Sequence, residues 1–322
     1  MSNSWTTRAR KLVSLAGPLV GLVIALVLFA VLVPDRFLSF YNFKTVVTQT
    51  VIVGLGAIGM TYVMASGGID LSVGSVIALA SVVTAIILRD GGSPALALLG
   101  GVGTGVLVGV VNGVLVTRLR IVPFIVTLGA MGIARGLAKY LANEQTVNAP
   151  AGWLAEMMTK TPDPAWLFVS RGAWITLVLA VAMISVLRRT VFGVHVLAVG
   201  SNEATAHLCG VRVDRVKVVV YALSGLFAGL AGVMQFGRLT VGDPTTAIGL
   251  ELDVIAAVVL GGGSLSGGSG SITGSLLGAF FMAVLANGCT LAGVPTYVQE
   301  ILVGAIIIAA VALDRVRQRA RA

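Results

Sequence analysis

Charged residues, histidine and cysteine are all scarce in this chain of 322 residues, and each shortage excludes a class of protein. Charged residues make up 11% of the chain, whereas a soluble domain carries about 25%, so the chain cannot cover a water-facing surface. The two histidines, His195 and His207, give a metal centre little to work with. The two cysteines, Cys209 and Cys289, form no CxxC pair and no disulfide framework, and we expect them on opposite sides of a membrane.

What remains is apolar. Apolar residues form 57% of the chain, and a helix needs about 20 of them in a row to cross the hydrocarbon of a bilayer. The net charge of +9 could indicate a nucleic-acid partner, but the basic residues stand at the ends of apolar stretches. The composition therefore predicts an all-α integral membrane protein and no nucleic-acid partner.

About ten membrane spans can be read, in a single transmembrane domain over residues 1–322, with no room for a large soluble domain. The first follows Arg8, Arg10 and Lys11 and is too long for a signal-peptide core, so we expect a retained span. The spans 72–88 and 251–261 are short and could be re-entrant. The expected spans are 12–33, 45–66, 72–88, 95–117, 121–140, 173–187, 217–237, 251–261, 271–289 and 298–313.

An even number of spans places both termini on one side, and the positive-inside rule makes that side cytoplasmic. The larger share of the 22 lysines and arginines then lies inside: Arg8, Arg10, Lys11, Arg118, Arg120, Arg188, Arg189, Arg212, Arg215, Lys217, Arg315, Arg317, Arg319 and Arg321.

Two loops are long. The outer one, about 141–172, contains Trp153 and Trp166, and a short helix on the outer surface is plausible there. The inner one, about 188–216, is polar and basic. It has a helix-like stretch near 201–209 that Ser201 or Asn202 could cap.

Glycines recur every four residues within several spans, which places them on one helix face and lets another backbone approach closely. We read them first as packing surfaces and secondly as hinges. These glycines are Gly101, Gly105, Gly109 and Gly113, then Gly225 and Gly229, and finally Gly270, Gly274 and Gly278.

A faint internal repeat relates residues 68–79, GIDLSVGSVIAL, to residues 249–260, GLELDVIAAVVL. Each segment has an acid at its third position, Asp70 and Glu251, at the mouth of a span. The two segments would run oppositely through the membrane, as in the inverted repeats of alternating-access transporters. Chance similarity between apolar segments is the alternative.

The segment Gly67–Ser75 is the most informative in the chain. Its glycines turn the backbone, and Asp70 and Ser72 meet the start of a helix, where a carboxylate is favoured. One interpretation is a well-capped helix, and the other is a gate or partner contact formed by Gly68, Asp70, Ser72 and Gly74.

A second glycine cluster, residues 260–271, could indicate a phosphate-binding loop. No lysine follows a glycine anywhere in the chain, so the Walker A pattern is absent. We interpret the cluster as a cytoplasmic turn and expect this chain to bind no ATP.

Few polar residues lie at membrane depth. Gln49, Asn112, Thr127 and Asn287 are candidates for lining a path, although bonds between helices would explain each equally well. Asp253, Glu300 and Arg135 lie near span ends, where an interfacial role suffices. No ionisable residue is convincingly central, which disfavours an ion-driven carrier, and no His or carboxylate pair predicts an enzyme.

In combination, several motifs make the chain resemble the permease subunits of the ribose/arabinose/xylose class of bacterial ABC importers, within the group that includes branched-chain amino acid permeases. The resemblance covers nearly the whole length. Its markers are Phe37-Leu38 with Asn42, Gly67–Ser75, Asn112-Gly113, Pro123–Gly129, Thr190–Gly193, Ala198–Ala204, Gly210-Val211 and Leu260–Ser271.

The resemblance implies a multi-pass protein of the bacterial inner membrane that acts with a second permease copy, identical or paralogous. It also implies cytoplasmic ATPase subunits, which use ATP and Mg²⁺, and an extracytoplasmic solute-binding protein. The inner loop would be the helix that couples to the ATPase, through Ala198, Gly200, Asn202, Glu203, Ala204 and Gly210.

A monosaccharide is the expected cargo, moved by alternating access. The same type of permease for a branched-chain amino acid, a nucleoside, inositol or a signal sugar is the alternative. A secondary carrier or channel, which would transport without an ATPase, is less favoured.

Overall fold

The structure, a computed structural model, describes residues 20–319, without the side chains of residues 165 and 313–319. The expectations that rest on residues 12–19 and on the N-terminus lie outside this range. Helices dominate, as the sequence predicts. They are the helical residues Val20–Leu32, α2 (Pro34–Phe37), α3 (Phe40–Ala65), α4 (Val73–Arg89), α5 (Pro94–Arg118), α6 (Pro123–Leu141), α7 (Trp153–Glu156), α8 (Arg171–Arg189), α9 (Val191–Ser201), α10 (Glu203–Leu208), α11 (Val213–Leu239), α12 (Leu250–Leu260), α13 (Ile272–Leu291) and α14 (Thr296–Arg319).

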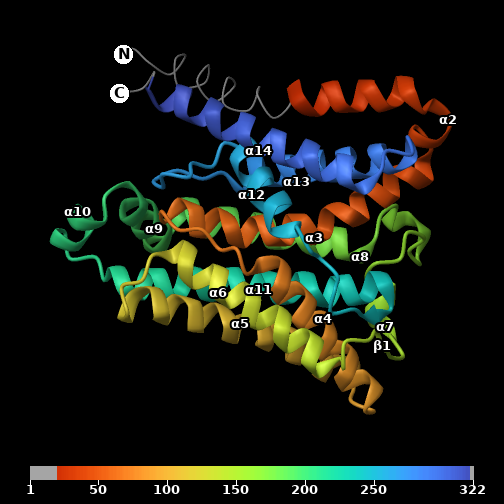
Figure 1. The fold of residues 1–322 in the computed structure, drawn as a ribbon, viewed down its shortest axis with the longest axis horizontal. Coiled ribbons are helices and arrows are strands. Elements are labelled where there is room, and N and C mark those ends of the chain that lie inside the picture. The colour runs from red at the N-terminus through yellow and green to blue at the C-terminus, as the bar shows by residue number, and fades with distance from the viewer. Residues whose placement is uncertain (1–19, 320–322) are drawn as a thin grey trace.

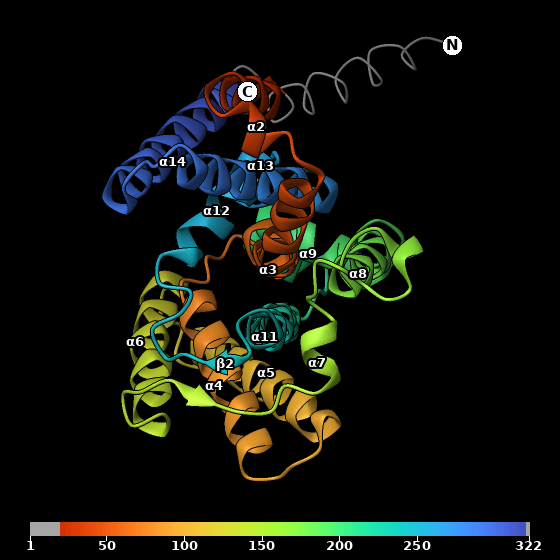
Figure 2. The same ribbon diagram turned by 90° about the vertical axis from the view of Figure 1, so that its right-hand side faces the viewer.

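The long helices lie roughly along one direction, with α3 and α11 at the centre of the bundle (Figures 1 and 2). In the end-on view α4, α5 and α6 lie on one side of this pair, while α12, α13 and α14 lie on the other. We call the end that carries α9 and α10 the inner end, following the positive-inside rule. The opposite end, with α7 and β1, is the outer end.

Six helices of the described chain are long and apolar enough to cross a membrane: α3, α5, α6, α8, α11 and α13. Shorter apolar helices occupy Val20–Leu32, Val73–Arg89, Val191–Ser201 and Thr296–Ala312. The predicted multi-pass architecture is confirmed. Helix α9 is a correction, because its 11 residues fall in what the sequence predicted as a polar inner loop.

Helix α12 is too short to cross the membrane by itself. Its 11 residues rise about 16 Å, against a hydrocarbon thickness of about 30 Å. The non-helical residues 240–249 precede it, so this short predicted span is a half-crossing rather than a full one.

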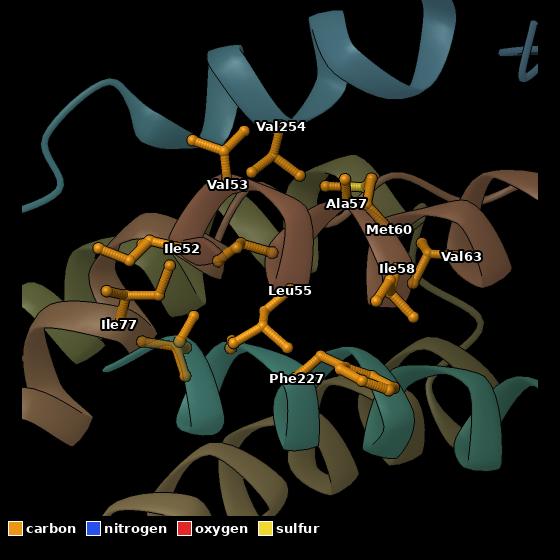
Figure 3. Packing of buried hydrophobic residues seen from close by; sticks show 14 of the residues in the cluster. Ile52, Val53, Leu55, Ala57, Ile58, Met60, Val63, Ile77, Phe227 and Val254 are labelled. Carbon is orange, nitrogen blue, oxygen red and sulfur yellow. The ribbon is translucent and has the colours of Figure 1, made fainter. Parts of the chain in front are cut away.

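The core forms where α3 meets its neighbours. Leu55 and Ile58 of α3 lie toward Phe227 of α11, while Val53 lies toward Val254 of α12 (Figure 3). All five side chains are buried. Lipid gives helices no hydrophobic reason to associate, so van der Waals contact of this kind holds them together.

The predicted glycine stripes lie at the closest helix contacts. A Cβ on Gly105 of α5 would overlap the carbonyl oxygen of Gly225 on α11, and one on Gly225 would overlap that of Gly105. Gly274 and Gly278 of α13 similarly face the backbone of Gly261 and Ala257. Close backbone approach therefore requires these residues, as in other membrane helix pairs.

The outer loop contains little regular structure. It includes the four-residue helix α7 and the strand β1 (Val147–Asn148), which pairs antiparallel with β2 (Val241–Gly242). This pairing joins the outer loop to the non-helical residues 240–249 that lead into α12.

Candidate functional site

The chain turns back at the inner end, between the end of α3 and the start of α4. Helix α3 ends at Ala65, and α4 begins only at Val73, so residues 66–72 form a non-helical bend. The amides of Gly67 and Gly68 donate to the carbonyl oxygens of Met64 and Val63, both over 2.9 Å. Gly67 has φ +83°, which favours glycine. The local sequence thus encodes the turn.

Asp70 organises the bend. Its Oδ1 accepts from the backbone N–H of Ser72 at 3.0 Å and from the Ser72 hydroxyl at 2.6 Å. Its Oδ2 accepts from the Ser224 hydroxyl of α11 at 2.8 Å. Ser72, the N-cap of α4, makes no side-chain capping bond. The expected helix cap is therefore corrected: Asp70 links the bend to α11 instead of capping the first turn of α4.

Two further helices join the same cluster. The Asn112 amide of α5 donates to the Ser72 hydroxyl over 3.0 Å, and the Thr127 hydroxyl of α6 donates to the carbonyl oxygen of Ile69 over 3.2 Å. Both side chains are fully buried. We call Ile69, Asp70, Ser72, Asn112, Thr127 and Ser224 the polar node. It fixes the start of α4 relative to α5, α6 and α11.

The first turns of α4 and α12 meet. A Cβ on Gly74 of α4 would overlap the Glu251 carboxylate of α12 and lie 2.6 Å from the Ala247 carbonyl oxygen. Glycine at position 74 therefore allows the start of α12 to approach α4. Glu251 Oε2 is buried and has no hydrogen-bond partner.

These contacts agree with the inverted repeat. Helix α3 runs from the outer to the inner end and α11 runs the opposite way (Figure 1). Each is followed by a non-helical stretch and then by a shorter helix, α4 or α12. Discontinuous helices of this kind form the substrate sites of several transporter families.

Arg135 of α6 binds the backbone of the turn residues before α12. Its Nη1 donates to the carbonyl oxygens of Pro244 at 2.8 Å and Thr246 at 2.7 Å. Arg135 therefore has a role beyond the interfacial one that the sequence predicts, because it satisfies backbone groups that no helix or sheet satisfies.

A cavity of about 250 Å³ lies in the outer half of the bundle, between α3, α11, α12 and α13. Gln49, one of the four predicted path residues, lines it, and so do Gln235 and Asp253. Asn112 and Thr127 belong to the polar node, and Asn287 is a buried residue of α13. Gln235 was missed by sequence reasoning, although an amide in the apolar stretch 225–237 is a signal.

The inner loop folds into two helices. Asn202 caps α10, because its Oδ1 accepts from the amide of Thr205 over 2.9 Å. The amide of Asn202 donates to the carbonyl oxygen of Ala198 over 3.0 Å. Glu203 pairs with Lys217 of α11 over 2.7 Å. The predicted cap is confirmed. The Asn202 amide links the start of α10 to α9, and the Glu203–Lys217 ion pair links it to α11.

Gly200 lies at a junction of three segments. A Cβ there would overlap the carbonyl oxygen of Ala65 at the end of α3, and would lie 2.7 Å from the amide of Gly268. That amide also donates to Ala65 over 3.0 Å. The last turn of α9, the end of α3 and the second glycine cluster therefore meet, just before the chain enters α10.

A broad groove of about 1160 Å³ opens beside α10 at the inner end. Glu203, Ala204 and Gly210 line it, together with the α5–α6 turn and the start of α11. Its basic residues are Arg118, Arg120, Arg212, Arg215 and Lys217.

Known proteins are similar to this chain over almost its whole length. Residues 42–311 match the family described as branched-chain amino acid transport system / permease component. An L-arabinose ABC transporter permease of Azospirillum brasilense is 41% identical over 302 residues, which cover 93% of this chain and 88% of that protein. A ribose import permease of Bacillus subtilis is 40% identical over 306 residues, 93% of this chain and 92% of the relative.

A fructose import permease of Rhizobium meliloti is 38% identical over 308 residues, which cover 93% of this chain and 85% of the relative. No solved structure matches.

Proposed function

This chain belongs to the branched-chain amino acid transport system permease family, and we propose that it forms the membrane path of an ABC importer for a monosaccharide. The observation that carries the proposal is the likeness, over 93% of the chain, to permeases named for arabinose, ribose and fructose. The protein is accordingly a multi-pass protein of the bacterial inner membrane.

Alternating access is the mechanism that the fold supports best. The shorter helices α4 and α12 begin beside each other at Gly74 and Glu251, and each follows a non-helical stretch. Because these stretches carry no continuous helical hydrogen-bond ladder, they are the parts of the bundle that can change direction at least cost. Their movement would open the path first to one side and then to the other.

Energy would come from separate ATPase subunits, which use ATP and Mg²⁺, while this chain catalyses nothing. We place the ATPase contact at α10, with Ala198, Gly200, Asn202, Glu203, Ala204 and Gly210. Through Gly200, α9 touches the end of α3 next to the bend. A displacement of α10 by the ATPase would therefore be transmitted through α9 and the end of α3 to the proposed gate residues Gly68, Asp70, Ser72 and Gly74.

On the outer side, a loaded solute-binding protein would dock on the outer loops, and a second permease copy, identical or paralogous, would complete the pore. The family description favours a second candidate cargo, a branched-chain amino acid. Uptake of labelled leucine rather than a labelled sugar would select this alternative.

Co-purification in mild detergent tests the assembly. The chain should retain an ATPase subunit, and the complex should hydrolyse ATP faster with sugar-loaded binding protein. The isolated chain should hydrolyse none. Hydrolysis by the isolated chain, or purification without any ATPase under conditions that preserve the fold, would overturn the proposal.

A further inference from the structure

The cavity in the outer half of the bundle differs in character from the polar node. In the node, the Asp70 carboxylate accepts three hydrogen bonds at 2.6–3.0 Å from the protein, and only Asn112 Oδ1 is buried there without a partner. In the cavity, polar side chains from separate helices converge on open space of about 250 Å³. That volume lies just below the range of about 300–1,000 Å³ typical of drug-sized ligands.

Gln235 is the clearest sign that the cavity holds a ligand. Its side chain is only 3% exposed, and its Nε2 donates to the Thr246 hydroxyl over 2.5 Å. Its Oε1 is buried without a hydrogen-bond partner. Turning the amide would leave an unpartnered NH₂ in place of the oxygen. A buried polar group without a partner destabilises the structure, so a ligand that donates a hydrogen bond to this oxygen would bind favourably.

A second amide repeats the pattern. Gln49 of α3 also lines the cavity, and its Oε1 is buried without a partner. Asp253 of α12 and Arg238 of α11 add one acid and one base. Such a lining has no net charge and offers both donors and acceptors. It suits a neutral ligand rich in hydroxyl groups, because each hydroxyl can donate and accept at once.

The remaining lining is apolar. Ile52 of α3 and Met282 and Ala283 of α13 offer C–H surface beside the amides. A pocket with a few placed polar groups among apolar ones is the usual form of a small-molecule site. A pyranose or furanose ring presents both kinds of surface, with hydroxyls at its rim and C–H groups on its faces.

We propose that this cavity is a monosaccharide subsite in the outer half of the path, in which Gln49, Gln235 and Asp253 bind the sugar hydroxyls. The inference rests on the proposed sugar import and adds a site within the path where the sugar binds transiently. Asp253 belongs to the first turn of α12, and Thr246 belongs to the non-helical stretch that Arg135 binds. Movement of α12 would therefore dismantle the site and release the sugar.

The experiment uses the complete importer, with its own ATPase and binding protein, in proteoliposomes. Radiolabelled ribose, L-arabinose and fructose are the probes, and both uptake and ATP hydrolysis are measured. For Gln235→Leu we expect the number of sugars moved per ATP hydrolysed to fall roughly 2- to 12-fold, the value of one hydrogen bond. The matched control is Gln299→Leu, because Gln299 of α14 is half-buried and bonded to the Val294 carbonyl oxygen outside the cavity.

A second variant covers the case in which Gln235→Leu does not fold. Ala286 lines the cavity and is exposed, so Ala286→Leu should fill the space without disturbing the core. Its control is Ala292→Leu, at the exposed C-cap of α13. Filling the cavity should lower uptake per ATP, whereas the control should match the wild type.

The outcomes separate the two proposals. If the wild type moves a probe sugar while Gln235→Leu and Ala286→Leu match their controls, the subsite is wrong and sugar import stands. If the wild type moves none of the three sugars, sugar import and the subsite fail together.

Discussion

The Ser224 hydroxyl donates to Asp70 Oδ2 over 2.8 Å, across 154 positions of sequence. This bond joins the centre of α11 to the bend between α3 and α4. The bend carries Gly68, Asp70 and Ser72, for which a gate or partner contact is one of two interpretations of the sequence. Helix α11 precedes the second segment of the expected repeat, residues 249–260. In the proposed alternating-access mechanism, this buried bond lies where the two halves of the bundle would move relative to each other.

Removing this hydroxyl should loosen the polar node. Ser224→Ala takes one of the three donors from the buried Asp70 carboxylate, so we expect a loss of about 1–3 kcal/mol of stability and a lower melting temperature in detergent. Ser185→Ala is the control, because that hydroxyl bonds only within α8, to the Val181 carbonyl oxygen over 3.0 Å. Equal melting temperatures for the two variants would contradict the role of the node.

Two glycines of α5 give a matched test of close helix packing. A Cβ on Gly105 would overlap the Gly225 carbonyl oxygen, whereas one on Gly103 would meet nothing within 4 Å. Gly105→Ala should force α5 and α11 apart and destabilise the protein by about 1–3 kcal/mol. Gly103→Ala should leave the melting temperature unchanged or raise it slightly, since alanine is the better helix former. Similar losses for both variants would refute the packing account.

Charge reversal at Glu203 tests the coupling surface. Glu203→Lys should abolish uptake while leaving membrane insertion intact, because the acid faces the groove beside α10. Glu203 also pairs with Lys217, and that pair is largely exposed on the acid side, so it contributes at most about 1 kcal/mol. Lys217→Met removes the same pair without touching Glu203. If both variants lose uptake equally, the ion pair matters and the ATPase contact does not.

The junction at Gly200 should be equally sensitive to size. Gly200→Ala places a methyl group against the Ala65 carbonyl oxygen, so α9 must shift away from α3. We expect ATP hydrolysis to continue while uptake falls, because the push on α10 no longer reaches the bend. Gly304→Ala is the control, since its Cβ would meet nothing within 4 Å. Normal uptake by Gly200→Ala would exclude this route of coupling.

Much of this fold follows from local sequence. Apolar length predicts the long helices to within a few residues, four-residue spacing predicts the glycine contacts, and the residues near 202 predict the cap of α10. Each of these depends on neighbours along the chain. The half-crossing of α12 was only partly foreseeable, because its 11 apolar residues fit a short span as well as a half-helix.

Contacts between distant segments could not be predicted. Nothing near Arg135 indicates that it binds the carbonyl oxygens of Pro244 and Thr246, and nothing near Gly74 indicates Glu251 as its neighbour. Gln235 and Asp253 share a cavity only because the fold places the outer part of α11 and the start of α12 around the same space, beside α3 and α13. Helical periodicity tells which face of a helix is apolar, but not which helix covers that face.

ATP-driven sugar uptake is the most direct test of the account. The chain, its ATPase subunits and its binding protein are reconstituted in proteoliposomes, and labelled ribose, L-arabinose and fructose are supplied outside. We expect at least one sugar to accumulate inside, only when ATP is present with the ATPase and only with binding protein outside. Accumulation by vesicles that contain the chain alone, or no ATP-dependent accumulation of any sugar by the complete importer, would contradict the account.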